Sequence, residues 1–154
     1  MKKIGVKDRF MEEALIKAEE SITQGGGPIG AVIVKNDVII ASGISAGNII
    51  LKPYAHAEHM AIDEACSKLG VKKLNGCVLY SSLEPCLMCL GLIYWAGIRE
   101  VIYACRKETY PFYYETNLHI DAITDAFLEK MDCAWNENYE GQSKEIIDLF
   151  LKNK

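Results

Sequence analysis

From residue 56 onward the sequence alternates between helix-like and strand-like segments, and this alternation limits the folds open to it. A helix is predicted from about His56 to Leu69, ended by Gly70, and a buried strand follows from Cys77 to Ser82. A second helix, "PCLMCLGLIYWA", with Pro85 as its first residue, precedes another strand, "EVIYAC". Strands joined through helices pair in parallel by right-handed crossovers.

The N-terminal part adds a helix and a hairpin. Asp8 is expected to cap a helix whose apolar residues recur at helical spacing until "GGGP" interrupts it. Two apolar runs, "IGAVIVK" and "VIIASG", are separated by Asn36 and Asp37, which favour a hairpin turn. Residues 44–54 are expected to form a loop. A mixed sheet with helices on both faces satisfies these patterns, so we predict an α/β fold, a three-layer α/β/α sandwich.

The remainder of the chain has a weaker pattern. "YPFYYETNLH" is predicted to be a loop, either a lid that stacks on a base or an ordinary packed segment, and "IDAITDAFLEKM" and "SKEIIDLFLKN" are predicted helices. The sequence contains no internal repeat, low-complexity segment or linker. A chain of 154 residues is of ordinary size for one domain, so we expect a single domain over residues 1–154.

Charge and composition exclude several classes of protein. A net charge of −4 and a pI near 5.4 argue against a broad phosphate-binding face, so a nucleic-acid partner is not expected. No segment approaches the roughly 20 apolar residues of a membrane span, and the N-terminus lacks an apolar signal region. We therefore expect a cytoplasmic protein without a membrane partner.

Six cysteines in a cytoplasmic chain indicate metal binding or burial rather than disulfides. Four of them lie in apolar or mixed surroundings and are interpreted as small buried hydrophobic residues: Cys66, Cys77, Cys105 and Cys133.

The other two cysteines, Cys86 and Cys89, are three residues apart in the first turn of a predicted helix. Residues at this spacing share a helix face, and the positive end of the helix dipole favours the thiolates that bind metal. His56 also begins a predicted helix, and helix starts gather at one edge of an α/β sheet. We predict that these three residues bind zinc and leave a fourth position open, as in catalytic sites.

Glu58 follows His56 by two residues and is predicted to be the catalytic residue. Zinc lowers the pKa of bound water from roughly 16 to about 7, and a neighbouring carboxylate can move its proton. The alternative is a structural zinc whose fourth ligand is His59 or Cys105. The pattern H-x-E…P-C-x-x-C is typical of zinc deaminases, and it is present as "HAE" and "PCLMC".

The chain resembles the cytidine-deaminase-like zinc deaminases, and among them the bacterial guanine deaminases. The similar segments extend from the first helix to about Cys105, roughly two thirds of the chain: "GPIGAVIVK", "HAE", "EPCLMCLG" and "IYWAG". The resemblance implies that Trp95 lines the substrate pocket. It also implies a homodimer, with residues of about 115–154 exchanged between subunits.

Three features depart from that family. Ungapped matching places Ser45 where the family usually has a substrate-binding asparagine, and Asn48 comes three residues later. Ile29 stands where guanine deaminases tend to have a phenylalanine that stacks on the base. The chain also ends in "FLKNK", without the usual terminal aromatic residue. The predicted substrate contacts are Ile29, Ser45, Asn48, Trp95 and the backbone amide of Ala57.

Our leading hypothesis from the sequence is hydrolytic deamination of a free nucleobase, guanine to xanthine, with release of ammonia. One alternative is a tRNA adenosine deaminase, and another is a deaminase of a cytosine-type base, nucleoside or nucleotide. The alternative outside enzymes is a zinc-stabilised binding domain.

Overall fold

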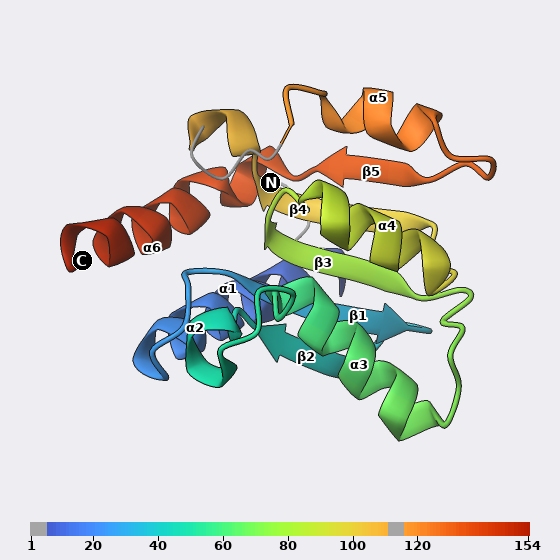
Figure 1. The fold of residues 1–154 in the computed structure, drawn as a ribbon, viewed down its shortest axis with the longest axis horizontal. Helices are drawn as coiled ribbons and strands as arrows, with labels where there is room; N and C mark the ends of the chain where they lie inside the picture. The colour runs from blue at the N-terminus through green and yellow to red at the C-terminus, as the bar shows by residue number, and fades with distance from the viewer. Residues whose placement is uncertain (1–5, 111–115) are drawn as a thin grey trace.

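The computed structural model describes residues 6–110 and 116–154, which form a five-stranded mixed sheet with the strand order β2-β1-β3-β4-β5 (Figure 1). Strand β1 pairs antiparallel with both β2 and β3, whereas β3 pairs in parallel with β4, and β4 with β5. The strands are β1 (Gly30–Lys35), β2 (Val38–Ile44), β3 (Val78–Leu83), β4 (Glu100–Cys105) and β5 (Asp132–Trp135). The predicted mixed sheet and its parallel part are therefore confirmed.

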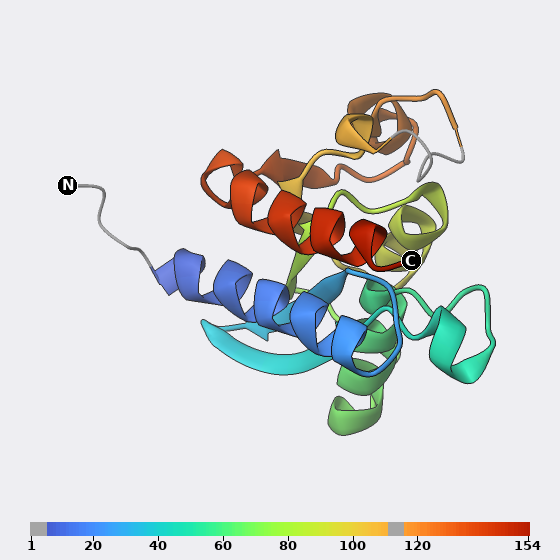
Figure 2. The ribbon, with the colours of Figure 1, turned by 90° about the vertical axis from the view of Figure 1, so that its left-hand side faces the viewer.

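Helices cover both faces of this sheet, which confirms the predicted three-layer sandwich. The helices are α1 (Val6–Thr23), α2 (Gly47–Ile50), α3 (Ala57–Leu69), α4 (Leu87–Trp95), α5 (Ile120–Asp125) and α6 (Glu140–Lys152). Figure 1 shows α3 and α4 on one face, and Figure 2 shows α1 and α6 side by side on the other. Short 3-10 turns, η1 (Lys107–Thr109) and η3 (Glu137–Tyr139), follow β4 and precede α6.

Strand β1 lies inside the sheet and is buried on both faces, which explains its continuous apolar sequence. Successive side chains of a strand point to opposite faces. Ala31 and Ile33 accordingly join the core beneath α3 and α4, while Val32 and Val34 join the core beneath α1. One short strand thus connects both halves of the hydrophobic core.

The predicted hairpin turn is confirmed. Asn36 and Asp37 have φ angles of 50° and 60°, so both central residues adopt the left-handed conformation of a type I′ turn. This turn matches the twist of the strands and joins β1 to β2.

The predicted starts of two helices were wrong. Asp8 is not a cap, because α1 has already begun at Val6. Pro85 is not the first residue of α4, because Cys86 is the N-cap and its sulfur accepts a hydrogen bond from the Cys89 amide. The capping sulfur thus shifts the start of the helix to Leu87.

The predicted bounds also differ at three other segments. The expected loop over residues 44–54 contains the short helix α2, and the helix predicted over 120–131 ends at Asp125. Strand β5 was not predicted, because its four residues are mostly exposed and carry no clear alternation. Within residues 6–110 and 116–154, no helix is long and apolar enough to cross a membrane.

The C-terminal helix packs on its own chain. Ser143 Oγ donates a hydrogen bond of 2.6 Å to the Ser82 carbonyl, and Tyr139 Oη donates one of 3.1 Å to Glu12. Ile147 is fully buried against the sheet side of α6. The exchange of this segment between subunits stays a prediction.

Candidate metal centre and active site

Two helix starts meet at the edge of the sheet where the parallel strands end. His56 is the N-cap residue of α3, and Cys86, three residues beyond the end of β3, is the N-cap residue of α4. This arrangement places His56 Nδ1 3.5 Å from Cys86 Sγ and 3.6 Å from Cys89 Sγ. The structure therefore brings together the three predicted metal ligands.

These three residues fit a zinc ion. A tetrahedral ion with bonds of about 2.0–2.3 Å to nitrogen and sulfur requires donors separated by roughly 3.5 Å. The three donor atoms lie within 4.8 Å of one another, and among the described residues no fourth histidine, cysteine or carboxylate joins them. His59, proposed as an alternative fourth ligand, instead packs its ring against Tyr54 at 4.9 Å between centroids. Three protein ligands are typical of catalytic rather than structural zinc.

The electrostatics at the two cysteines differ from those at the other thiols. A hydrogen bond from the Cys89 thiol, helped by the His56 ring and the Cys89 amide, lowers the pKa of Cys86 to about 4 against the effect of burial. The same hydrogen bond raises the pKa of Cys89, because its proton is shared with the Cys86 thiolate. By contrast, burial raises the pKa of both Cys105 and Cys133 to about 12. Cys86, the N-cap residue of α4, is therefore the cysteine whose surroundings favour the thiolate.

Glu58 lies beside this group and is nearly inaccessible, with 4% of its surface exposed. Ser81 Oγ donates a hydrogen bond of 3.2 Å to Glu58 Oε1, and the Cys89 thiol lies 3.6 Å from Oε2. Burial raises the pKa of Glu58, and the negative charge of Cys86 raises it further. A carboxyl group with a raised pKa holds its proton at higher pH than an exposed one, which suits a group that accepts and returns protons.

A cavity of about 70 Å³ lies directly against Glu58. Its walls come from the start of α3, the ends of β3 and β4, and the segment before β1: Ile29, His56, Glu58, Leu83, Glu84, Cys86 and Lys107. The cavity therefore joins the metal group, the acidic residue and a small apolar surface.

The predicted substrate contacts are distributed unevenly around this cavity. Ile29 lines it, and Ala57, between His56 and Glu58, is fully buried as the first residue of α3. Ser45 lies in the adjacent loop, where its amide donates to the Ile29 carbonyl at 3.1 Å. Asn48 is exposed within α2. Neither Ser45 nor Asn48 is part of the cavity wall.

Trp95 is not brought to the cavity. It is the last residue of α4 and is 74% exposed, whereas Cys86 lies at the beginning of that helix. A rise of about 1.5 Å per residue separates the two ends of α4 by more than ~10 Å. The Trp95 carbonyl accepts a hydrogen bond of 2.5 Å from Lys73 Nζ at that distant end.

Three residues of the cavity were missed from the sequence: the apolar Leu83 and two charged residues, Glu84 and Lys107, which are 7% and 1% exposed. Glu84 Oε2 accepts a hydrogen bond of 3.1 Å from the Lys107 backbone amide, and the Glu84 amide donates to the Cys105 carbonyl at 2.8 Å. Their positions directly after β3 and β4 were the available signal, because parallel strands end at one edge. Glu84 also borders a second cavity of about 240 Å³, lined by residues 116–119.

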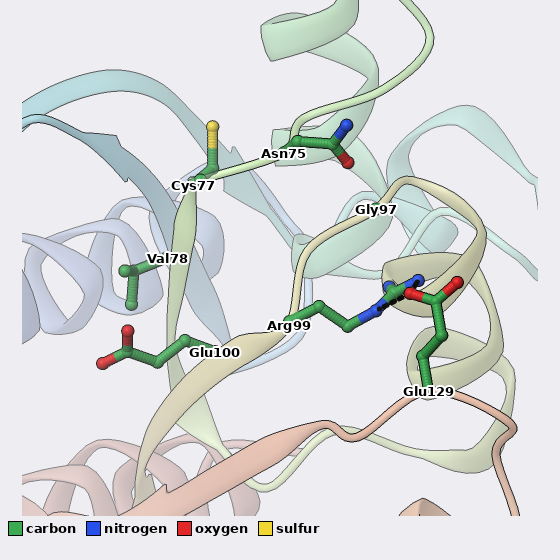
Figure 3. A pocket seen from close by; sticks show the side chains of 8 residues that line it. Asn75, Cys77, Val78, Gly97, Arg99, Glu100 and Glu129 are labelled. Carbon is green, nitrogen blue, oxygen red and sulfur yellow. Dashed lines mark hydrogen bonds and ion pairs between the residues drawn. The ribbon is translucent and has the colours of Figure 1, made fainter.

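A larger cavity, of about 490 Å³, lies at the opposite edge of the sheet (Figure 3). Its lining residues stand at the beginnings of β3 and β4 rather than at their ends. Figure 3 shows Arg99 pointing toward Glu129, with an ion pair of 2.8 Å between them. The metal-binding group lies far from this cavity along the strands, so the larger space is not the candidate active site.

Comparison with known proteins agrees with this geometry. Residues 5–105 match the sequence profile described as the cytidine and deoxycytidylate deaminase zinc-binding region. The chain is 49% identical to guanine deaminase from Bacillus subtilis over 98 residues, which are 63% of each protein. The crystal structure of that enzyme superposes with a TM-score of 0.64 and 47% identity, over 66% of this chain and 65% of the other.

Similarity to tRNA deaminases is nearly as high. The tRNA-specific adenosine deaminase of Aquifex aeolicus is 41% identical over 98 residues, covering 64% of this chain and 65% of the relative. A solved structure from a study of tRNA:A34 deaminases is 30% identical with a TM-score of 0.75, over 86% of this chain and 100% of that chain. The matched segment thus spans less than two thirds of the two curated relatives.

Proposed function

The chain belongs to the cytidine and deoxycytidylate deaminase zinc-binding family, and we propose that it is a zinc-dependent enzyme that deaminates guanine. The proposed reaction consumes guanine and water and yields xanthine and ammonia. The observation that carries this proposal is the buried Glu58, whose Oε2 lies 3.6 Å from one sulfur of the three-residue metal group and which lines the same cavity.

His56, Cys86 and Cys89 would hold the zinc ion, which acts as a Lewis acid and lowers the pKa of a bound water. Glu58 moves the protons. It accepts one proton from the attacking water and transfers it to the ring nitrogen beside the amino-bearing carbon. It then accepts the remaining proton of the added hydroxyl group and transfers it to the amino group, which leaves as ammonia while the carbon keeps the oxygen as a carbonyl. The raised pKa of Glu58 supports this role, because a carboxyl group that ionises closer to neutral pH both accepts and returns protons efficiently.

Neighbouring groups orient Glu58 and the base. The hydrogen bond from Ser81 fixes Oε1, which leaves Oε2 on the side of the Cys89 sulfur. The amide of Ala57 is among the first N–H groups of α3, which have no partner within a helix, so it is a candidate donor to the base. Ile29 supplies an apolar wall against which a planar ring can pack.

Deamination of adenosine in tRNA is the second candidate. It is favoured by the 41% identity to the Aquifex aeolicus enzyme and by the tRNA:A34 deaminase structure, which covers 86% of this chain, compared with 66% for the Bacillus subtilis guanine deaminase structure. The net charge of −4 weighs against it, because tRNA binding depends on neutralising phosphates.

The test is a comparison of ammonia release from guanine, adenine, cytosine, their nucleosides and tRNA by the zinc-loaded protein. We expect guanine to be converted to equimolar xanthine and ammonia. The matched variant Glu58→Gln keeps the shape of the side chain, and we expect it to lower kcat about 10²- to 10⁴-fold while zinc content stays unchanged. An active Glu58→Gln protein contradicts the assigned role, and inosine formation in tRNA without xanthine formation contradicts the substrate.

A further inference from the structure

A buried cation forms part of the cavity wall. Lys107 is 1% exposed, begins the η1 turn directly beyond β4, and lines the same 70 Å³ cavity as Glu58. An ammonium group is costly to bury unless acceptors surround it. The proposed mechanism uses Glu58 and the metal ligands but assigns Lys107 no role.

Glu84 is the acidic neighbour of Lys107. Its Oε2 accepts the Lys107 backbone amide at 3.1 Å, and it is 7% exposed in the same wall. Burial raises the pKa of Glu84, while this hydrogen bond and the charge of Lys107 act in the opposite direction. Because both residues line the same cavity, one ligand bound there can contact both.

Their chemistry matches one edge of particular bases. An ammonium group only donates hydrogen bonds, and a carboxylate only accepts them. An ammonium group beside a carboxylate therefore fits a ring carbonyl, which accepts a hydrogen bond, next to a ring N–H, which donates one. Guanine presents such an edge at its 6-oxo group and N1–H, and free cytosine presents one at its 2-oxo group and N1–H. Adenine has no oxo group, so it offers no comparable acceptor beside an N–H.

The charge balance of the wall also limits the substrate. Among the described residues that line the cavity, one ammonium group, on Lys107, faces two carboxyl groups, on Glu58 and Glu84. Where a phosphate dianion lies next to Glu58 or Glu84 rather than at the metal ligands, the ionised carboxyl groups would repel it, whereas they do not repel a neutral base. A free base fits this wall better than a nucleotide.

We propose that Lys107, together with Glu84, is a specificity determinant that selects bases with an oxo group beside a ring N–H and rejects adenine-type bases. This inference rests on the proposed deaminase function and narrows its substrate class to guanine- and cytosine-type free bases. It assigns Lys107 to the oxo group and Glu84 to the adjacent N–H.

The test uses two ligand pairs, guanine with 2-aminopurine and cytosine with 4-aminopyrimidine. The second member of each pair lacks both the oxo group and the ring N–H beside it. Binding is measured by calorimetry on the zinc-loaded Glu58→Gln protein, in which turnover is blocked, with Lys107 native or changed to Met. We expect the native Lys107 protein to bind at least one oxo base about 10- to 100-fold more tightly than its oxo-free partner. Lys107→Met should reduce that preference, because only the Glu84 contact with the ring N–H remains, and it should change binding of the oxo-free partner less than about twofold.

Met is unbranched and similar in length to Lys, so it fills the same space without the charge. Circular dichroism and zinc content check that the Lys107→Met protein is folded. If the Lys107→Met protein does not fold, the comparison within each ligand pair on the protein with native Lys107 still tests the inference. Equal binding within both ligand pairs, or no binding of either oxo base, overturns the inference.

The outcome is separable from that of the proposed function. If the protein binds the oxo bases more tightly in a way that depends on Lys107 and still forms no xanthine, that result would refute the guanine reaction and leave the inference intact. Xanthine formation with equal losses for both members of a pair in Lys107→Met would refute the inference and leave the reaction intact.

Discussion

At the residue scale, the hydrogen bond from Ser81 to Glu58 affects the pKa of Glu58, the residue proposed to move protons. Its length is 3.2 Å, and it lowers the pKa of Glu58 against the larger effect of burial. In Ser81→Ala this pKa rises further, so the acid limb of the kcat/KM profile should move to higher pH. The measurement is the pH dependence of ammonia release.

Ser82→Ala is the matched control. Ser82 is equally buried, but its hydroxyl accepts from the Gly30 amide at 3.0 Å and belongs to the opposite side of the strand. This variant should lose stability without moving the acid limb. An acid limb that stays in place in Ser81→Ala would show that Ser81 does not tune Glu58.

The buried carboxyl group also has a cost for stability in the metal-free protein. The pKa of Glu58 is raised above its ordinary value of 4.5 by burial, so the folded state binds this proton more tightly than the unfolded state. Its favourable contribution is full below pH 4.5 and is lost as the pH rises through the raised pKa. Above pH 4.5 the unfolded state ionises readily while the folded state resists ionisation, so Glu58 destabilises the fold increasingly as the pH rises.

Glu58→Gln should consequently stabilise the metal-free protein at pH 7. The urea midpoint, measured in the presence of a chelator, should be higher in the variant at pH 7, and the difference should shrink toward pH 4. Equal midpoints at pH 7 would indicate that burial of Glu58 carries no electrostatic penalty.

The residues predicted from sequence were those whose positions depend on local spacing. Cys86 and Cys89 share a helix start, and His56 lies two residues before Glu58, so sequence distance was sufficient to group them. Lys107 could not be found in this way. Its place in the cavity depends on how the end of β4 meets the end of β3, a contact between segments more than twenty residues apart.

At the element scale, helix α3 lies so close to strand β2 that only glycine fits at position 43. A Cβ atom on Gly43 would overlap the Ala57 carbonyl oxygen and lie 2.5 Å from the Ala61 nitrogen. Gly43→Ala should push away the start of α3, which carries His56 and Glu58. We expect a loss of about 1–3 kcal/mol in unfolding free energy and weaker zinc binding. Urea unfolding and zinc titration against a chelator measure the two effects.

Gly91→Ala supplies the control in another helix. Gly91 lies inside α4, and a Cβ atom there would meet nothing within 4 Å. Replacing an unconstrained helical glycine by alanine stabilises by up to about 1 kcal/mol. Zinc affinity should stay unchanged in this variant. If Gly43→Ala is tolerated as well as Gly91→Ala, the close approach of α3 does not position the metal ligands.

Element types were easier to predict than their lengths. The buried strands and long helices have strong apolar patterns, and these were placed within a few residues. Strand β5 and helix α5 are short, and their limits depend on tertiary contacts such as the pairing of β5 with β4. Local sequence contains little information of that kind, which is why "DCAW" was not recognised as a strand.

At the scale of the whole molecule, the C-terminal segment supports the cavity although it lies beyond the family match, which ends at residue 105. Ile147 of α6 is fully buried in a cluster with Leu83, Cys105 and Tyr110. Leu83 also lines the cavity beside Glu58. Tyr110 Oη donates a hydrogen bond of 2.9 Å to Asp148, which ties the start of the loop to α6. Residues 111–115, which include the rest of "YPFYY", predicted to be either a lid or an ordinary packed loop, lie outside the described part of the chain.

Ile147→Ala should therefore weaken both the fold and the site. Removing a fully buried isoleucine costs about 2–5 kcal/mol, and the cavity left behind Leu83 should also raise KM. Leu149→Ala, on the exposed side of the same helix with 58% exposure, should change unfolding free energy by less than about 0.5 kcal/mol. Thermal unfolding and steady-state kinetics measure these effects.

The same pair of variants tests whether residues 115–154 are exchanged in the homodimer that the family resemblance implies. Light scattering first identifies a dilution at which the protein is monomeric. If α6 packs on its own chain, as its hydrogen bond to Ser82 indicates, Ile147→Ala remains destabilising at that dilution, because the buried contact is intramolecular. If the segment is exchanged, the monomer has no such contact to lose, and Ile147→Ala unfolds like Leu149→Ala. An equal midpoint for the two variants in the monomer would thus assign the contact to a partner subunit.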